Sequence, residues 1–228
     1  MSKLYIIATP IGNLEDITFR AVRILKECDS VLCEDTRMTR KLLSHYAIGT
    51  HTMSYHAHSK IGKLEKIFEM LEDGKDLALV SDAGTPTISD PGSILVSMVK
   101  EKFGIQVQVI PIPGPSAVVA MLSASGLPSS DFLFLGFLPH KKGRETLFKE
   151  ISESERTVVF YESPHRLEKS LVSLVEHLEP NRIVVVAREI TKIFEDFVSG
   201  TPLEVMTFFA EHTDKVRGEF VLAVAPKI

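Results

Sequence analysis

Short apolar runs rich in β-branched residues recur along the chain and alternate with stretches that have helical periodicity. The runs lie at residues 4–8, 30–33, 76–80, 106–110, 132–136, 157–161, 182–187 and 219–225. This alternation is typical of α/β proteins, in which amphipathic helices connect buried strands. The pattern therefore predicts an α/β fold.

Two of the intervening stretches carry apolar residues at helical spacing, and they end at Gly74 and Pro180, where helices commonly stop. The apolar residues are Ile61, Leu64, Ile67, Phe68 and Leu71 in the first, and Leu167, Leu171, Leu174, Val175 and Leu178 in the second. We interpret both stretches as helices that pack one apolar face on the core.

A segment with little charge and frequent proline and glycine, residues 111–130, lies near the middle of the chain. We place the domain junction there and expect an N-terminal α/β domain over residues 1–114 and a C-terminal α/β domain over residues 115–228. Each domain would hold a small sheet flanked by helices. Because such proteins bind ligands at strand ends, we expect the active site in a cleft between the two domains.

The composition is that of an ordinary globular protein, with 44% hydrophobic and 25% charged residues in a chain of 228. The apolar stretch near the amino terminus has only five residues before Thr9, too short for a signal peptide, and prolines break the longest uncharged run. We therefore expect a cytoplasmic protein without a membrane segment. A net charge of −4 argues against nonspecific coating of nucleic acid but allows a local basic patch.

Several common site chemistries lack their residues in this sequence. Neither G-x-G-x-x-G nor G-x-x-x-x-G-K-[ST] occurs, and residues 114–118 (GPSAV) lack the closing glycine of a serine-hydrolase elbow. The two cysteines, Cys28 and Cys33, sit among apolar neighbours and are expected to be buried, reduced thiols.

A metal site is conceivable at His51, His56 and His58, because alternate positions of a strand point to one face. No acidic or thiol partner lies close to them in the sequence. We therefore favour solvent-exposed or substrate-facing imidazoles over a metal.

Four loops that follow predicted strands are dense in glycine, proline and polar residues, as ligand-binding loops of α/β proteins are. They are residues 8–16 (ATPIGNLED), 33–40 (CEDTRMTR), 80–92 (VSDAGTPTISDPG) and 112–117 (IPGPSA). Four further motifs stand in the second half: residues 138–144 (LPHKKGR), 160–166 (FYESPHR), 187–192 (AREITK) and 217–220 (RGEF).

The ordered set of eight motifs resembles the tetrapyrrole methylase superfamily. The particular residues within these motifs resemble the branch of small-subunit ribosomal RNA cytidine 2′-O-methyltransferases. The resemblance covers essentially the whole chain. It implies two α/β domains of the tetrapyrrole methylase type, S-adenosylmethionine as methyl donor, ribosomal RNA or the small ribosomal subunit as partner, and a homodimer.

The resemblance also implies site residues. Asp82 is the leading donor-site residue, because a carboxylate after a buried strand can accept hydrogen bonds from an amine or a ribose. A turn or helix cap is the alternative role for Asp82. The expected donor-binding residues are Pro10, Asp82, Gly84, Thr85, Ser116, Ala117, Tyr161 and Ala187.

A ribose hydroxyl is a very weak acid, so a positioned general base would help the transfer. The candidates, which the sequence does not rank, are Glu162, His165, Glu189 and Glu219. Two basic clusters suit RNA phosphates, although a solvated surface would explain them as well. Their members are Arg37, Arg40, His56, Lys141, Lys142, Arg144, Arg166 and Arg188.

Two alternatives remain open at this point. The same fold and donor pocket serve methylases that act on a tetrapyrrole carbon, and fold alone does not separate the two substrates. The second alternative is a catalytically silent binding module, against which the preserved polar loops argue.

Overall fold

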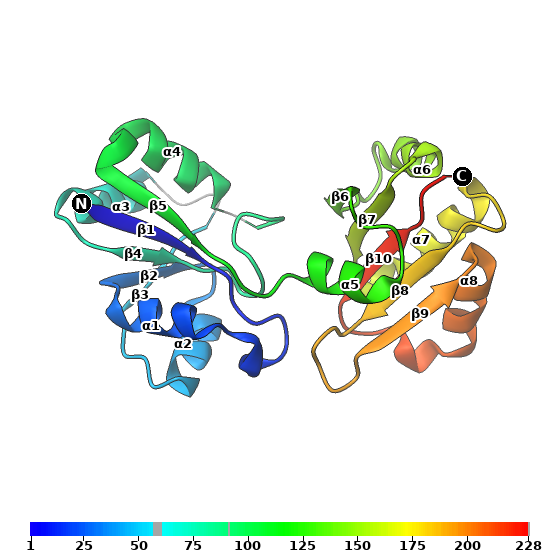
Figure 1. Cartoon of the computed structure of the whole chain (residues 1–228), viewed down its shortest axis with the longest axis horizontal. Coiled ribbons are helices and arrows are strands. Elements are labelled where there is room, and N and C mark those ends of the chain that lie inside the picture. The colour runs from blue at the N-terminus through cyan, green and yellow to red at the C-terminus, as the bar shows by residue number, and fades with distance from the viewer. Residues whose placement is uncertain (57–60, 91, 228) are drawn as a thin grey trace. The chain divides into compact units, whose positions relative to one another are not determined.

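The computed structural model of the chain describes residues 1–56, 61–90 and 92–227 (Figure 1). It divides into two compact units, Met1–Ser116 and Ala117–Ile228. The boundary derived from the sequence lies after Gly114. Each unit has its own mixed layer of strands and helices, so the expected fold with two α/β domains is confirmed.

The first unit contains a parallel sheet (blue to green in Figure 1). Its strands are β1 (Ser2–Ile7), β2 (Ser30–Cys33), β3 (Thr52–Ser54), β4 (Leu77–Leu79) and β5 (Val107–Ile112), in the order β3-β2-β4-β1-β5. All neighbouring strands are parallel. The loops that follow the strands therefore leave the sheet at one edge, which is where this class of fold places its ligands.

Helices pack on both faces of this sheet. The helices α1 (Phe19–Glu27) and α2 (Thr36–His45) contribute to one apolar cluster, and α3 (Ile61–Glu72) and α4 (Ser93–Phe103) contribute to another. The short 3-10 helices η1 (Leu14–Asp16) and η2 (Gly104–Gln106) lie in connections. Cys28 and Cys33 are free and buried, as predicted, and burial raises the pKa of Cys28 to about 12.

The second unit contains a mixed sheet in the order β6-β7-β10-β8-β9. Its strands are β6 (Phe132–Phe137), β7 (Thr157–Glu162), β8 (Val184–Arg188), β9 (Asp196–Gly200) and β10 (Phe220–Val224). The pair β6–β7 is parallel and the other neighbouring pairs are antiparallel. The central strand, β10, is thus the one that comes last in the chain.

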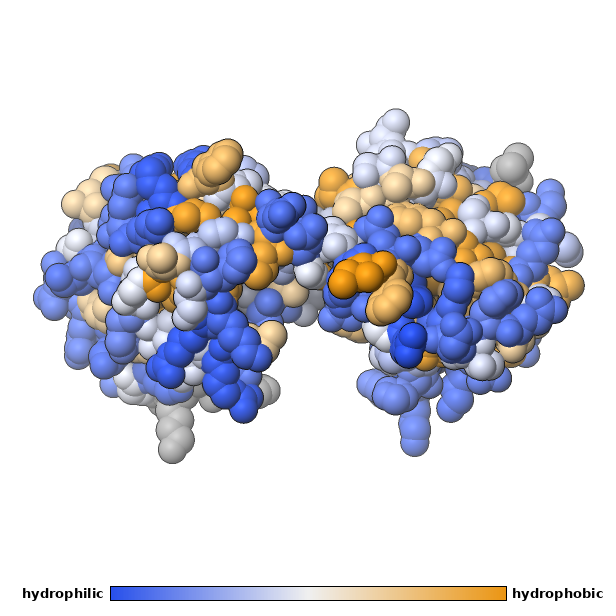
Figure 2. All heavy atoms as spheres, turned by 90° about the horizontal axis from the view of Figure 1, so that it is seen from below, coloured by the Kyte–Doolittle hydropathy of each residue, from blue (hydrophilic) through white to orange (hydrophobic). Residues whose placement is uncertain are grey.

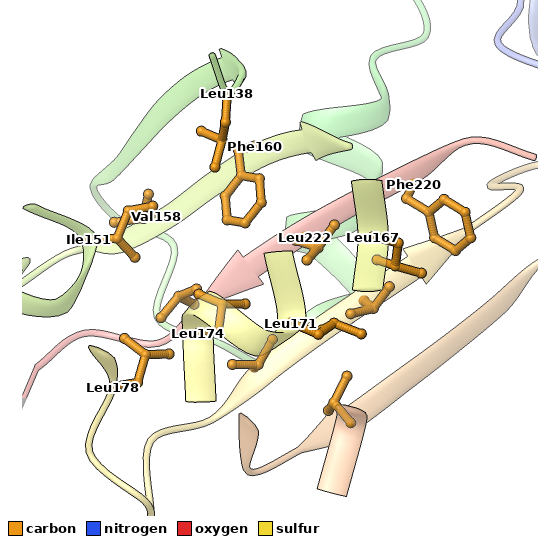
Figure 3. Packing of buried hydrophobic residues seen from close by; sticks show 14 of the residues in the cluster. Leu138, Ile151, Val158, Phe160, Leu167, Leu171, Leu174, Leu178, Phe220 and Leu222 are labelled. Carbon is orange, nitrogen blue, oxygen red and sulfur yellow. The ribbon is translucent and has the colours of Figure 1, made fainter. Parts of the chain in front are cut away.

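The helices of the second unit are α5 (Ala117–Ser125), α6 (Arg144–Glu153), α7 (Pro164–His177) and α8 (Pro202–Glu211), with the short 3-10 helix η3 (Thr213–Lys215). The helices α6, α7 and α8 share one core cluster with the sheet. In Figure 3, Leu167 of α7 lies by Phe220 of β10, and Leu138 lies by Phe160 of β7. The predicted apolar stripe of α7 is confirmed, because Leu167, Leu171 and Leu174 are buried there.

Two strands, β3 and β9, were not predicted from the pattern of apolar runs. Each lies at an edge of its sheet and is only partly buried. An edge strand has a neighbour on one side only, so it does not need the continuous apolar run that marks the central strands.

The edge strand β6 departs from expectation in the other direction, since its apolar run predicts burial. Phe132, Leu133 and Phe137 are 40%, 43% and 58% exposed. Figure 2 shows that hydrophobic atoms reach the surface of both units on the face drawn, interrupted by polar atoms. In the described part of the chain, no helix has both the length and the apolar character needed to cross a bilayer.

Candidate functional site

In the first unit, three strand-end loops are joined by backbone contacts. The N–H of Thr9 donates to the carbonyl of Gly84 at 2.9 Å, and the N–H of Gly84 donates back at 3.0 Å. The N–H of Ala8 donates to the carbonyl of Ile112 at 3.3 Å, and the hydroxyl of Thr85 donates to the carbonyl of Pro115 at 3.2 Å. The loops after β1, β4 and β5 therefore form one assembly at the carboxyl edge of the sheet.

Small residues make this assembly possible. Gly84 has φ of +79°, a left-handed conformation that favours glycine. A Cβ on Gly114 would lie 3.0 Å from the Cβ of Ala8, which is closer than side chains normally approach. Residues expected to bind the donor, Gly84, Thr85 and Ser116, thus lie on loops that hold one another, and Pro10 follows the bridge residue Thr9.

Beside these loops, the first unit has an open hollow of about 410 Å³. The loops after β2 and β4, the strand β3 and the residue His56 line it, through Glu34, Asp35, Thr36, Arg37, Ser54, His56 and Asp82. Its volume is in the range of small-molecule sites. The exposed Asp82 carboxylate contacts the neighbouring loop, because its Oδ1 accepts from the N–H of Asp35 at 3.3 Å.

The hollow is acidic, and its carboxyl groups differ in their environments. Burial, followed by the charges of Asp90 and Asp82, raises the pKa of Glu34. Within the described residues, the buried Oε1 of Glu34 has no hydrogen-bond partner. Asp35 is the opposite case: hydrogen bonds from the Arg37 side chain, with Nη2 to Oδ2 at 2.7 Å, hold its pKa well below the usual range.

The basic residues expected in this unit have different surroundings. The exposed Arg37 is paired with Asp35, which is the N-cap of α2. Arg40 is also exposed, and its Nε donates to the Thr52 hydroxyl at 3.3 Å. His56 is exposed at the hollow, and His58 lies outside the described residues. Among the residues that are described, no group of three or more His, Cys, Asp or Glu side chains could hold a metal.

In the second unit, Glu162 ends β7 and has no exposed side-chain atoms. Its Oε1 accepts from Arg166 Nε at 2.8 Å and from the N–H of Ser163 at 2.8 Å. Its Oε2 accepts from the Ser170 hydroxyl at 2.5 Å and lies 3.6 Å from Arg144 Nη2. Three residues from the expected lists of base and RNA contacts, Glu162, Arg144 and Arg166, therefore form one internal network.

Glu189 and Glu219 share a second network through Lys192. The Nζ of Lys192 lies 2.7 Å from Glu189 Oε1 and 3.0 Å from Glu219 Oε2. The N–H of Glu219 also donates to Glu189 Oε1 at 3.0 Å. Burial opposes ionisation of Glu189, but the hydrogen bonds from Lys192 and from the backbone of Glu219 outweigh it, so the pKa of Glu189 is lowered.

Other expected residues of this unit lie apart from these contacts. His165 is exposed in the first turn of α7, and Lys141 and Lys142 are exposed in the loop before α6. Tyr161 packs edge-on against Phe134, with ring centroids 5.1 Å apart, and Ala187 is fully buried in β8.

Arg188 is 5% exposed, and within the described residues its Nε has no hydrogen-bond partner. Its register partner in β10 is Phe220, which in turn pairs with Glu162 in β7. Side chains in one such row lie on the same face of the sheet. Arg188 and Glu162 thus occupy the polar end of the face that carries the core cluster.

Ser170 of the Glu162 network and Glu34 of the hollow were not among the site residues expected from the sequence. Ser170 is fully buried, three positions after Leu167 on the apolar face of α7. A polar residue at a core-facing helical position was the signal that could have found it. Glu34 gave no comparable signal, since it stands among other acidic and polar residues of its loop.

Comparison with known proteins covers almost the whole chain. The family described as Tetrapyrrole (Corrin/Porphyrin) Methylases matches residues 3–205. Proteins named ribosomal RNA small subunit methyltransferase I are similar to the chain. The relative from Halalkalibacterium halodurans is 49% identical over 97% of this chain and 75% of its own length. The relative from Hydrogenobaculum sp. is 42% identical over 98% of this chain and 95% of its own length.

Solved structures agree at the level of the fold. A cobalt precorrin-4 methyltransferase superposes with a TM-score of 0.70 at 18% identity, covering 98% of this chain and 94% of the other. A uroporphyrin-III C-methyltransferase from Thermus thermophilus gives a TM-score of 0.64 at 17% identity, with 98% and 94% covered. The chain therefore belongs to the tetrapyrrole methylase family.

Proposed function

We propose that the chain is a methyltransferase that uses S-adenosylmethionine to methylate the 2′-hydroxyl of a cytidine in small-subunit ribosomal RNA. The observation that carries the proposal is the near full-length similarity, at 42% to 49% identity, to proteins named ribosomal RNA small subunit methyltransferase I. The solved tetrapyrrole methyltransferases, at 17% to 18% identity, support the fold only.

The first unit offers residues that suit the donor. Its three loops pack through backbone and small residues, and the exposed Asp82 carboxylate stands at the same edge. We propose that Asp82 accepts hydrogen bonds from the amine or ribose of the donor and that Pro10, Gly84, Thr85 and Ser116 bound it. Ala117, Tyr161 and Ala187 belong to the second unit, and their contact with the donor stays a prediction. When bound, S-adenosylmethionine supplies a methyl group on a positively charged sulfur.

The protein's own contribution to the transfer is alignment, exclusion of water and removal of the hydroxyl proton. Among the four candidate bases, Glu162 is fully enclosed, and Glu189 and Glu219 are ion-paired with Lys192. The exposed His165 is the candidate that keeps an accessible ring, so we propose it as the base. In His165→Gln, loss of a general base should lower kcat by about a hundredfold or more.

Exposed basic side chains supply the RNA contacts in this proposal. They are Arg37, Arg40, His56, Lys141 and Lys142, all exposed. Within the described residues, the Nε of the buried Arg188 has no hydrogen-bond partner, and a buried donor left unsatisfied is costly, which favours a phosphate oxygen as its acceptor. We also propose that the protein works in the cytoplasm, where ribosomes assemble, and that it forms a homodimer, which sedimentation at working concentration would test.

Tritiated methyl transfer tests the function directly. The purified protein is incubated with labelled donor and, in separate reactions, with unmodified small subunits, free 16S ribosomal RNA and a porphyrinogen. Label in a cytidine 2′-O-methyl group of the RNA is expected. Label in the porphyrinogen alone would assign the chain to the tetrapyrrole methylases that act on carbon.

Calorimetry with S-adenosylmethionine tests the donor site. Asp82→Ala should weaken binding by about tenfold or more, the value of a hydrogen bond to a charged group. Asp73→Ala is the matched control, because Asp73 is an exposed carboxylate just after α3 and away from the loops. Equal affinity of wild type and Asp82→Ala would remove the donor-site assignment, and an absence of binding by wild type would favour a silent binding module.

A further inference from the structure

The loop between β6 and α6 carries three exposed basic residues in succession, His140, Lys141 and Lys142. Flexible lysines bind phosphates weakly unless the chain that carries them is held in place, because ordering on binding costs free energy. The residues on both sides of this loop are fixed in an unusual way. Leu138, just before it, is buried in the core beside Phe160 (Figure 3).

Two guanidinium groups hold the start of the loop. Arg166 Nη1 donates to the carbonyl of Leu138 at 2.8 Å, and Arg144 Nη1 donates to the carbonyl of Pro139 at 3.3 Å. Arg144 is also the first residue after the loop, so its side chain reaches back across the loop to its start. The two carbonyls precede His140 directly.

Both guanidinium groups are in turn held by Glu162 and Ser170. Arg166 Nε lies 2.8 Å from Glu162 Oε1, and Arg144 Nη2 donates to the Ser170 hydroxyl at 2.7 Å. The side chains of Arg144 and Arg166 are only 15% and 14% exposed. They therefore have little surface left for an RNA phosphate, and the Glu162 carboxylate offsets one of their two positive charges.

We infer that Glu162, Ser170, Arg144 and Arg166 form a clamp that positions the basic loop, residues 140–142, for contact with RNA phosphates. Glu162 acts in this arrangement as a positioning residue rather than as the general base. Arg144 and Arg166 act through the loop rather than on the RNA. The inference rests on the proposed function, since it assigns the residues that orient its RNA-binding loop.

Kinetics with unmodified small subunits test the clamp through Glu162→Gln, which keeps the size of the side chain and removes its charge. The KM for the subunit is expected to rise by about tenfold, with kcat and the donor affinity changed less than about twofold. Ser170→Ala is a milder second variant, because it removes one hydrogen bond each from Arg144 and Glu162. Ser170→Ala should raise the KM for the subunit by about threefold. If Glu162→Gln does not fold, this variant alone tests whether the clamp positions the loop.

A double-mutant cycle separates positioning from general stability. Lys141→Ala/Lys142→Ala should raise the KM and lower the slope of log Kd against log salt by about 1.4, two contacts at about 0.7 each for single-stranded RNA. Adding Glu162→Gln or Ser170→Ala to that variant should change the KM by less than about twofold. Full additivity, or an unchanged KM in the folded single variants, would overturn the clamp.

Asp196→Asn is the matched control. Asp196 lies on the edge strand of the same sheet and pairs with Lys215 at 2.6 Å, away from the clamp. It should leave the KM for the subunit unchanged.

Hydrogen exchange of the Arg144 amide, which donates to the carbonyl of Lys141 in the loop at 3.2 Å, gives a readout that does not depend on activity. Exchange of this amide should be slow in wild type and in Asp196→Asn, and faster in Glu162→Gln and Ser170→Ala. If wild type neither binds nor methylates the subunit, the proposed function fails, while this measurement still decides whether the clamp exists. Equal exchange in all four proteins would refute the clamp.

Discussion

The loops at the strand ends of the two units are held by different kinds of contact. In the first unit, backbone groups and glycines join the loops, as in the Thr9–Gly84 bridge and the contact of Gly114 with Ala8. In the second unit, buried or paired carboxylates do so, as in the networks of Glu162 and Glu189. A loop built on backbone leaves its polar side chains available for ligands, whereas a loop built on ion pairs uses them for its own structure.

The same substitution in the two units should therefore have opposite consequences, and this is the largest effect we expect. Glu162→Ala leaves two mostly buried guanidinium groups without their carboxylate and should lower the free energy of unfolding by about 3–5 kcal/mol. Asp82→Ala removes an exposed carboxylate and should change it by less than about 0.5 kcal/mol, while weakening the donor. Urea unfolding followed by circular dichroism measures both.

A small stability change in Glu162→Ala would mean that the two arginines find other partners. A large change in Asp82→Ala would mean that its contact with the N–H of Asp35 at 3.3 Å is structural. Either result would contradict the proposed difference between the two units, in which carboxylates stabilise the loops of the second unit but not those of the first.

The glycine contacts of the first unit give an intermediate effect. In Gly114→Ala, the added Cβ would lie 3.0 Å from the Cβ of Ala8, so Ala8 must give way by a few tenths of an ångström. We expect a loss of about 1–3 kcal/mol in unfolding free energy and about tenfold in donor affinity.

Gly49→Ala is its control, because a Cβ at that position has no atom within 4 Å. Neither stability nor donor affinity should change measurably in this variant. If Gly114→Ala binds the donor as wild type does, the close packing of these loops serves the fold alone.

The smallest effect concerns pH and a helix pair of the second unit. In α7, His177 Nδ1 lies 2.8 Å from the carbonyl of Ser173, and its Nε2 lies 2.8 Å from Glu145 Oε1 of α6. Both partners only accept, so both contacts need the doubly protonated ring. The Ser173 carbonyl first, and then Glu145, raise the pKa of His177 against the effect of burial.

A pKa that is raised in the folded state stabilises the protein fully below the unfolded value of about 6.5, and the gain is lost as pH rises through the folded pKa. The difference in unfolding free energy between wild type and His177→Gln should therefore shrink as pH rises from about 6 to about 8. Thermal unfolding across this range measures it. A difference that grows with pH would show that the neutral ring is the stabilising form.

The central strands of both sheets could be predicted because a strand that is buried on both faces needs a continuous run of apolar residues. The strands β1, β2, β4, β7, β8 and β10 follow this rule, whereas β3 and β9 lie at edges and carry polar residues. The stripe of α7 was readable for the same reason. Its one polar member, Ser170, would have pointed to the Glu162 network.

The sequence indicated which residues belong to the candidate site, but it did not indicate the role of each one. Arg166 stands only four residues after Glu162, but Arg144 lies well before both, and its pairing with Glu162 depends on how α6 and α7 pack on β7. A charged residue in a strand-end loop looks the same in the sequence whether it faces solvent, as Lys141 does, or a buried partner. That distinction comes only from tertiary structure.

The place of β10 between β7 and β8 has a consequence for biosynthesis. The sheet of the first unit is complete once β5 has left the ribosome, so this unit can fold while translation continues. In the second unit, β7 and β8 each keep an open backbone edge until residues 220–224 emerge. A translational pause before that point would leave the unpaired backbone groups of two strand edges exposed. We therefore expect nascent chains to aggregate mainly through this half of the molecule.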